Sequence, residues 1–242
     1  MFTPEQRDAV RARVLELADE DTRVVAGAAV GSLAVGGGDR FSDLDLTFAV
    51  EDGQVDAVLA DWSRTLATEL DAIRLVDLAS GPTTYRVFLL PDGLQLDVSF
   101  TPASQFRPRG PRFRLLFGAA GEPAYPAAPD AADLFGWGAV YALHARSCVE
   151  RGRFWQAEHY IGAVRDHALS LACLREGVPA TQARGYDDLS TEARSQFADT
   201  HVAALDPASL RAALAAARAA LVREGLAAGI SHAEAVARRF VD

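Results

Sequence analysis

Hydrophobic and polar residues alternate strictly in two short stretches of the chain, which is the pattern of a half-buried β-strand. In residues 43–48 the apolar positions fall on one face, and the other face carries Asp43, Asp45 and Thr47. Residues 94–100 repeat this alternation, with four apolar positions on one face and Asp97 on the other. Each stretch therefore predicts a strand that presents carboxylates on its polar side.

Further patterns predict the elements that surround these two strands. Thr3, Pro4 and Gln6 have the order of an N-cap, a first helical residue and a capping box, so a helix is expected to begin here. Apolar residues at helical spacing predict a second helix over residues 54–71. Strands are expected at residues 24–30, at 73–78 and in a hairpin over 83–100. We therefore expect a mixed α/β sheet domain over residues 1–105.

The second half of the chain has helical periodicity instead. Asp130 is placed to cap a helix ending near Val149, and a second helix is expected over residues 153–176, before Gly177. Further helices are expected near residues 190–201, 207–226 and 231–240, which together make a bundle of about five helices over residues 131–242. The fold class predicted is therefore α/β (α+β), a mixed sheet followed by an all-α bundle.

Residues 106–130 separate the two predicted domains and are rich in Arg, Pro and Gly. Four arginines fall within eight residues of this connection: Arg107, Arg109, Arg112 and Arg114. Such a cluster can line a phosphate-binding site or belong to a solvated linker, and the sequence leaves both open.

Composition narrows the class of function. The chain has 242 residues and a formal net charge of −9, which argues against a protein that mainly grips a nucleic-acid backbone. Cys148 and Cys173 lie in apolar helical surroundings, so buried reduced thiols are favoured over a disulfide. The first residues have no apolar signal region and no stretch is long enough to cross a bilayer, so a cytoplasmic protein without a membrane partner is expected.

The carboxylates indicate metal chemistry. Asp43 and Asp45 on one face of a strand repel each other unless a cation lies between them, and hard oxygen ligands suit Mg²⁺. If the strand that carries Asp97 is a near neighbour, three carboxylates converge. Such a set can hold two ions roughly 3.5–4 Å apart, the arrangement used for in-line displacement at phosphorus.

A small-residue turn, Gly31-Ser32, follows the strand predicted at 24–30 and precedes the acid pair. Glycine lets the backbone come close to a phosphate, and Ser32 offers a hydroxyl and an N–H, although an ordinary turn has the same appearance. The three glycines at 36–38 do not make a P-loop, because no Lys-Ser or Lys-Thr follows them, and the spacing of a dinucleotide fingerprint is also absent.

Gly31-Ser32, ten residues, Asp43-Leu44-Asp45 and a later Asp97 on a strand resemble the nucleotidyltransferase superfamily of DNA polymerase beta. Within it the chain looks most like the small-molecule nucleotidyltransferases, of aminoglycoside or lincosamide type, that have a helical second domain. The resemblance implies an enzyme that transfers a nucleoside monophosphate from an NTP, with ATP the expected donor, to a hydroxyl group, and releases pyrophosphate.

The resemblance also implies roles for individual residues. Gly31 and Ser32, with Arg40 beside them, would hold the triphosphate, and Asp43 and Asp45 would bridge two Mg²⁺ ions. Asp97 would ligate the ion nearer the acceptor and can take its proton. In related drug-modifying enzymes a carboxylate of the helical domain can activate the acceptor, and Glu158 is the candidate here, with Asp166 behind it. An ion pair of Arg165 with either carboxylate is the structural alternative.

Three alternatives stay open. The acceptor can be a protein hydroxyl, as in nucleotidylating antitoxins, or the chain can bind a nucleotide without turnover. The third is the arginine-then-histidine pattern of HEPN-type ribonucleases, which Arg153 and His159 match loosely, although His159 also reads as a structural residue. The sequence does not indicate which acceptor is used or what the oligomeric state is.

Overall fold

The computed structural model describes residues 1–240, and the chain divides into two compact units, the first ending at Pro126 and the second beginning at Ala127. The first unit is built on a six-stranded sheet with the strand order β3-β4-β5-β2-β1-β6. Its strands are β1 (Val24–Val30), β2 (Leu44–Val50), β3 (Ile73–Ser80), β4 (Thr83–Leu89), β5 (Gln95–Pro102) and β6 (Phe113–Phe117). Neighbouring strands are antiparallel except β2 and β5, which run parallel.

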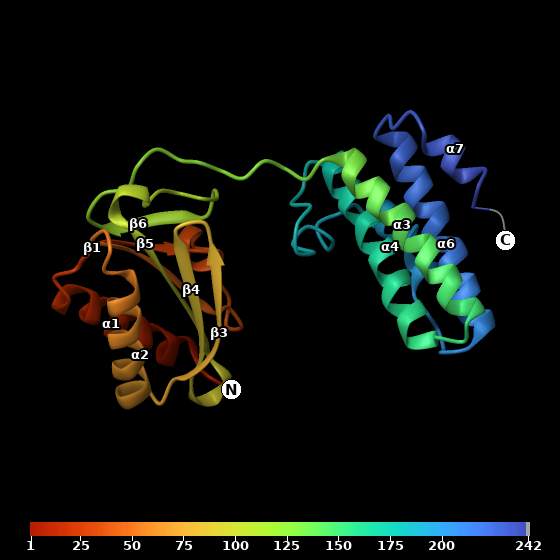
Figure 1. Cartoon of the computed structure of the whole chain (residues 1–242). Coiled ribbons are helices and arrows are strands. Elements are labelled where there is room, and N and C mark those ends of the chain that lie inside the picture. The colour runs from red at the N-terminus through yellow and green to blue at the C-terminus, as the bar shows by residue number, and fades with distance from the viewer. Residues whose placement is uncertain (241–242) are drawn as a thin grey trace. The chain divides into compact units, whose positions relative to one another are not determined.

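Two helices, α1 (Pro4–Glu20) and α2 (Val55–Leu70), cover one face of this sheet (Figure 1). The start of α1 is as predicted, since Thr3 and Gln6 form the reciprocal bonds of a capping box and Pro4 begins the helix. The core beneath the helices is centred on three aromatic rings. Trp62 of α2 meets Phe48 and Phe100 edge-on, with ring centroids 5.0 and 5.1 Å apart.

Strand β6 corrects one expectation of the sequence analysis. It lies inside the stretch 106–130, where only a connection was expected, and pairs antiparallel with β1 at the edge of the sheet. Phe113 and Phe117 supply the apolar positions of this five-residue strand. A five-residue apolar stretch among Arg, Pro and Gly residues is too short to be recognised as a strand from the sequence. Arg114 lies on β6 and its side chain is exposed, as are those of Arg109 and Arg112.

The second unit is helical, as predicted. Its long helices are α3 (Ala131–Glu150), α4 (Phe154–Glu176) and α6 (Pro207–Ala227), and its short ones are α5 (Thr191–Ser195) and α7 (Ala233–Ala237). Asp130 caps α3 by accepting a bond from the Asp133 amide, and Gly177 ends α4 in the left-handed conformation. Cys148 and Cys173 are buried free thiols, as expected. The α/β fold class followed by a helical region is therefore confirmed.

Two of the predicted helices are shorter than their sequences suggested. The helix expected near 190–201 is α5 followed by a separate 3₁₀ turn at Ala198–Thr200, and the helix expected at 231–240 is reduced to α7. Both segments have good helical propensity, but packing against α6 sets their conformation instead. Among residues 1–240, no helix combines the length and the apolar character that a membrane crossing requires.

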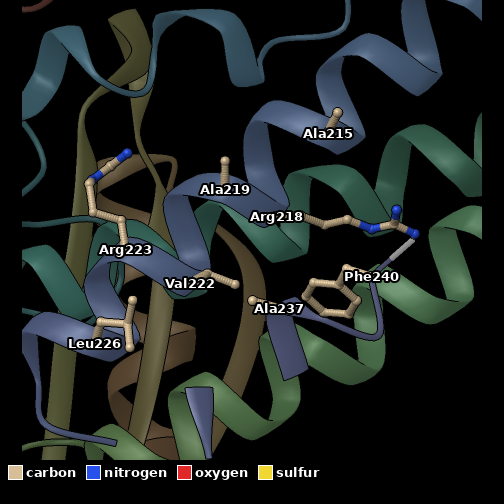
Figure 2. A pocket seen from close by; sticks show the side chains of 8 residues that line it. All are labelled: Ala215, Arg218, Ala219, Val222, Arg223, Leu226, Ala237 and Phe240. Atoms are coloured by element: carbon tan, nitrogen blue, oxygen red, sulfur yellow. The ribbon is translucent and has the colours of Figure 1, made fainter. Parts of the chain in front are cut away.

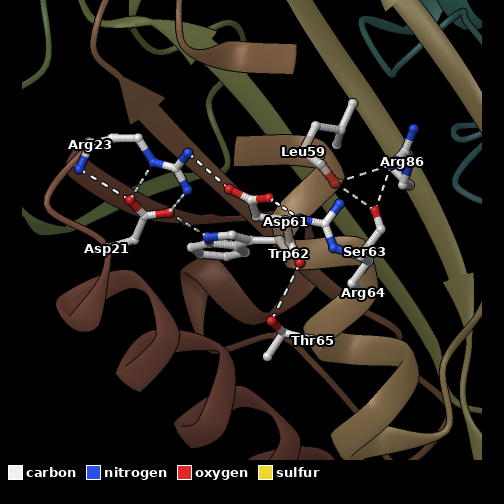
Figure 3. Close-up of polar contacts among 9 residues, drawn as sticks. All are labelled: Asp21, Arg23, Leu59, Asp61, Trp62, Ser63, Arg64, Thr65 and Arg86. Carbon is white, nitrogen blue, oxygen red and sulfur yellow. Dashed lines mark hydrogen bonds and ion pairs between the residues drawn. The ribbon is translucent and has the colours of Figure 1, made fainter. Parts of the chain in front are cut away.

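A polar network ties α1 to α2 on the helical side of the sheet (Figure 3). The Trp62 indole Nε1–H donates to the Asp21 carboxylate at 3.0 Å, and Arg23 binds the same carboxylate with Nε and Nη2, both at 2.8 Å. Arg23 also reaches Asp61 of α2 at 2.9 Å. These bonds satisfy the polar end of a tryptophan whose ring is otherwise in the core.

This network predicts a pH dependence of stability. Hydrogen bonds from Arg23 are the main cause that lowers the pKa of Asp21, with the Trp62 indole adding to them. A carboxyl whose pKa is lower folded than unfolded stabilises the fold above the unfolded value of about 4, and this stabilisation is lost as the pH falls through the folded pKa. Asp21→Asn should therefore cost about 1–2 kcal/mol at pH 7 and progressively less below pH 4. Urea unfolding from pH 7 to 3 measures the difference, and Asp19→Asn, at an exposed acid of the same helix, should show no such trend.

Candidate metal centre

The parallel pairing of β2 and β5 places three carboxylates together. Asp45 lies directly opposite Asp97 in the register of the two strands, and Asp43 immediately precedes β2. Each of the three side chains is half-buried and offers a carboxylate oxygen, and these oxygens lie within 4.8 Å of one another. The expectation that the two strands are neighbours in one sheet is confirmed, and with it the convergence of the three acids.

Side-chain alternation explains why the acids share a face. Leu44 and Leu46 of β2, and Leu96 and Val98 of β5, are almost fully buried in the core under α1 and α2. Because successive side chains of a strand point to opposite faces, the residues between them must point away from those helices. The helix-covered face therefore anchors the two strands, and the opposite face presents the carboxylates.

The electrostatics of this cluster favour a bound cation. Burial is the main cause that raises the pKa of Asp97, and the charge of Asp43 raises it further. The Gln95 amide opposes this shift by donating to Asp97 Oδ1 at 2.9 Å. Partial burial and mutual repulsion make the ionised carboxylates unfavourable, and a divalent cation bound between them offsets both effects. The donor set, three hard oxygens, fits Mg²⁺.

Gly31 lies against this cluster. It has φ +70° and ψ −152°, a conformation open to glycine alone, and a Cβ at this position would lie 2.3 Å from Asp45 Oδ2. Ser32 begins a single 3₁₀ turn, Ser32–Val35, which ends at Gly36 in the left-handed conformation. The sequence predicted a glycine that lets the backbone approach a phosphate. The structure adds that this glycine makes room for the Asp45 carboxylate.

The segment between this turn and β2 is folded on itself. Asp39 Oδ1 accepts bonds from the Phe41 amide at 2.9 Å and from the Ser42 hydroxyl at 3.1 Å, while the Asp39 amide donates to Ser42 Oγ at 2.9 Å. Arg40 projects from this loop, and its guanidinium Cζ lies 4.4 Å from the centre of the exposed Phe41 ring. Arg40 is three residues before Asp43, and its contact with a triphosphate stays a prediction.

One residue near the site was missed by sequence reasoning. Arg7 of α1 is only 6% exposed, and its Nη1 donates to the carbonyl oxygens of Asp39 at 2.6 Å and Ser42 at 3.1 Å. The helix also carries Arg11 and Arg13, and nothing in the sequence distinguishes Arg7 from such surface charges.

The candidates of the helical domain, Glu158 and Asp166, both lie on α4 of the second unit. Glu158 is half-buried on α4 and makes no ion pair within residues 1–240. Arg165 instead reaches Asp166 at 4.0 Å and the Thr200 carbonyl oxygen at 3.5 Å. The alternative of an Arg165–Asp166 pair is therefore seen, at the long end of an ion-pair distance.

The Arg153 and His159 pair of the ribonuclease alternative also lies at the start of α4. Arg153 is the N-cap residue of the helix, and the His159 ring packs on Tyr160 with centroids 5.3 Å apart. Both side chains are exposed, and a role for either stays a prediction.

A separate hollow of about 600 Å³ lies on the second unit, along α6 and residues 237 and 240 (Figure 2). Apolar side chains and two arginines line it, and the Arg218 guanidinium Cζ lies 5.1 Å from the centre of the Phe240 ring. Neither Glu158 nor any of the other residues predicted for the site lines this hollow.

No family model matches the sequence, and no curated protein matches it. Among solved structures, the chain is similar to the crystal structure of an aminoglycoside 6-adenyltransferase from Bacillus subtilis, at 13% sequence identity and a TM-score of 0.36. That match covers 92% of this chain and 95% of the other.

Proposed function

We propose that the first unit is the catalytic part of a Mg²⁺-dependent nucleotidyltransferase, which moves a nucleoside monophosphate from an NTP to a hydroxyl group. One observation carries this proposal: carboxylate oxygens of Asp43, Asp45 and Asp97 lie within 4.8 Å of one another, on the face of the sheet opposite α1 and α2. Three acids so close together are costly without a cation, and a carboxylate-bound Mg²⁺ is a common partner of phosphates.

The residues of this chain have distinct roles in the proposed reaction. Asp43, Asp45 and Asp97 would hold Mg²⁺, which when bound neutralises the phosphate charge and lowers the pKa of a bound hydroxyl. Gly31 and Ser32 bring backbone close to Asp45, where the triphosphate would lie, and Arg40 would add a positive charge beside it. Positioning and charge neutralisation account for most of the catalysis expected from such a site.

The bond changes balance without any further reactant. The acceptor oxygen forms a bond to the α-phosphorus of the NTP, and the bond from that phosphorus to the β-bridging oxygen breaks to release pyrophosphate. The acceptor proton passes to a carboxylate, for which Asp97 is the candidate within the cluster. Glu158 of the second unit is the other candidate for this proton, by the family resemblance.

The acceptor proposed is a small molecule with a free hydroxyl, of the aminoglycoside or lincosamide class. The net charge of −9 suits a cationic acceptor, since the field of the protein attracts it. Incubation with radiolabelled ATP and a panel of both drug classes, together with candidate proteins, identifies the acceptor. Label on a protein would favour the protein-directed alternative, and no labelled product despite tight nucleotide binding would favour a module without turnover.

Nucleotide binding tests the site before any acceptor is known. Calorimetric titration with each of the four NTPs should show binding that requires Mg²⁺ and that is lost in Asp43→Ala/Asp45→Ala. A matched control is Asp187→Ala/Asp188→Ala, which removes the same charge from two exposed residues of the second unit and should bind as wild type does. If wild type binds no NTP with Mg²⁺ present, the transferase proposal is wrong.

A further inference from the structure

The start of α1, together with the residue just before its N-cap, contacts the segments that lead into both acid-bearing strands. On the β2 side, Arg7 Nη1 donates to the carbonyl oxygens of Asp39 and Ser42, the second of which directly precedes Asp43. On the β5 side, the Phe2 amide donates to the Asp92 carbonyl oxygen at 3.0 Å. One helix terminus is therefore bonded to the chain just before each group of carboxylates.

The Arg7 contact has the character of a built anchor. Its side chain is almost fully buried, and its Nε has no hydrogen-bond partner within the described residues. Burying a guanidinium with an unsatisfied N–H costs free energy, which the two carbonyl bonds offset only in part. An arginine exposed to water would carry no such cost. We therefore take the two bonds to residues 39–42 as the reason that Arg7 is buried here.

Residues 39–42, which Arg7 binds, form a turn that can carry the restraint from Arg7 to Asp43. Three bonds between Asp39 and Ser42 close the segment into a compact turn: the Asp39 amide donates to Ser42 Oγ, the Ser42 hydroxyl donates to Asp39 Oδ1, and the Ser42 amide donates to the Asp39 carbonyl oxygen. A closed turn moves as one piece, so an anchor on its carbonyl groups also fixes the residue that follows it. That residue is Asp43, and Arg40 lies inside the turn.

The β5 side has a matching restraint. Asp92 lies in the turn before β5 with φ +60°, and its carboxylate Oδ2 accepts a bond from Gln6 Nε2 at 3.3 Å. Gln6 is itself fixed, because its side-chain oxygen accepts the Thr3 amide in the capping box at 2.7 Å. Asp97 follows in β5, where Gln95 orients its carboxylate.

From these contacts we propose that the N-terminal turns of α1 set the separation of Asp43 from Asp97, with Arg7 as the main positioning residue of the metal centre. This inference rests on the proposed function, because it needs the three acids to bind a metal. Arg7 touches neither the acids nor any reacting group, so it acts only through residues 39–42. Loss of such a supporting residue typically weakens metal binding by about 10–100-fold.

Three variants test the role of Arg7, with Mn²⁺ as the probe and its free concentration followed by electron paramagnetic resonance. Arg7→Met keeps the apolar stem and removes the donors, and should weaken Mn²⁺ binding about 10-fold. Arg7→Lys should restore affinity to within about threefold of wild type, because both native bonds come from a single nitrogen, which an ammonium can replace. Arg13→Met is the matched control: Arg13 lies on the same helix but pairs with Glu69, so affinity should not change.

The outcomes separate the two proposals. Equal Mn²⁺ affinity in wild type, Arg7→Met and Arg13→Met overturns the positioning role and leaves the metal centre standing. No Mn²⁺ binding by wild type, with or without ATP, overturns the metal centre and the positioning role together. Should Arg7→Met fail to fold, Ser42→Ala removes the two side-chain bonds that brace the turn and leaves α1 intact. It should weaken binding about threefold, and unchanged affinity there contradicts the inference.

Discussion

Asp97→Asn should abolish nucleotidyl transfer and at the same time make the metal-free protein more stable. Losing one of the three proposed metal ligands should lower pyrophosphate release by about 1,000-fold, since charge stabilisation of the transferred group is the main catalytic effect expected here. The same change removes a partly desolvated charge that Asp43 repels, so the unfolding temperature without Mg²⁺ should rise by a few degrees.

The pH dependence of that stability gain has a definite sign. The pKa of Asp97 is raised in the folded protein, so its protonated form is favoured there and its ionised form is penalised. The advantage of asparagine should therefore be absent below about pH 4, where the carboxyl is protonated, and should develop as the pH rises through the raised pKa. Thermal unfolding across pH 3–8 in a chelator measures it. Adding Mg²⁺ should stabilise the wild-type protein but not Asp97→Asn. If Asp97→Asn still releases pyrophosphate at the wild-type rate, the assignment of Asp97 to the metal centre is wrong.

Gly31→Ala should lower both the stability of the protein and its activity. It adds strain at φ +70° and puts a methyl group 2.3 Å from Asp45 Oδ2, so either the turn or the carboxylate must move. We expect a loss of about 2–3 kcal/mol in the free energy of unfolding and about a 100-fold loss in pyrophosphate release.

Gly36→Ala is the matched control for Gly31→Ala. Gly36 has φ +72° as well, but a Cβ there meets nothing within 4 Å. It should cost about 1 kcal/mol from backbone strain alone and leave activity near wild type. Urea unfolding and a pyrophosphate assay on both variants make the comparison. Equal losses of activity would mean that the space beside Asp45 is not what Gly31 provides.

Local patterns in the sequence were sufficient for the elements that carry the site. The alternation in residues 43–48 and 94–100 predicted the apolar side chains that β2 and β5 bury under the helices, and the buried Leu46 and Leu96 confirm it. It did not predict that Thr47 and Ser99, on the polar face, are buried too. What alternation cannot supply is which strands are neighbours. Thr47 and Ser99, whose hydroxyl groups are 2.8 Å apart, are separated by 52 positions, and only the three-dimensional fold joins them.

The features that were missed share a physical cause. Strand β6, the short α5 and α7, and the burial of Arg7 all depend on contacts with distant parts of the chain. An arginine at a helix start has the same sequence signal whether it meets water or two carbonyl groups. Local propensity likewise favours longer helices here, whereas the 3₁₀ turn after α5 and the short α7 both pack against α6.

The parallel pairing of β2 with β5 has a consequence for how the protein is made. As the chain leaves the ribosome, Asp43 and Asp45 emerge long before their partner strand, and α2, β3 and β4 come between them. Long-range pairing of this kind has a high contact order and forms late in folding. The nascent chain therefore has no assembled acid cluster until residues 95–102 are free to pair. Cation affinity would then appear in one step, as a reporter that β5 has paired with β2.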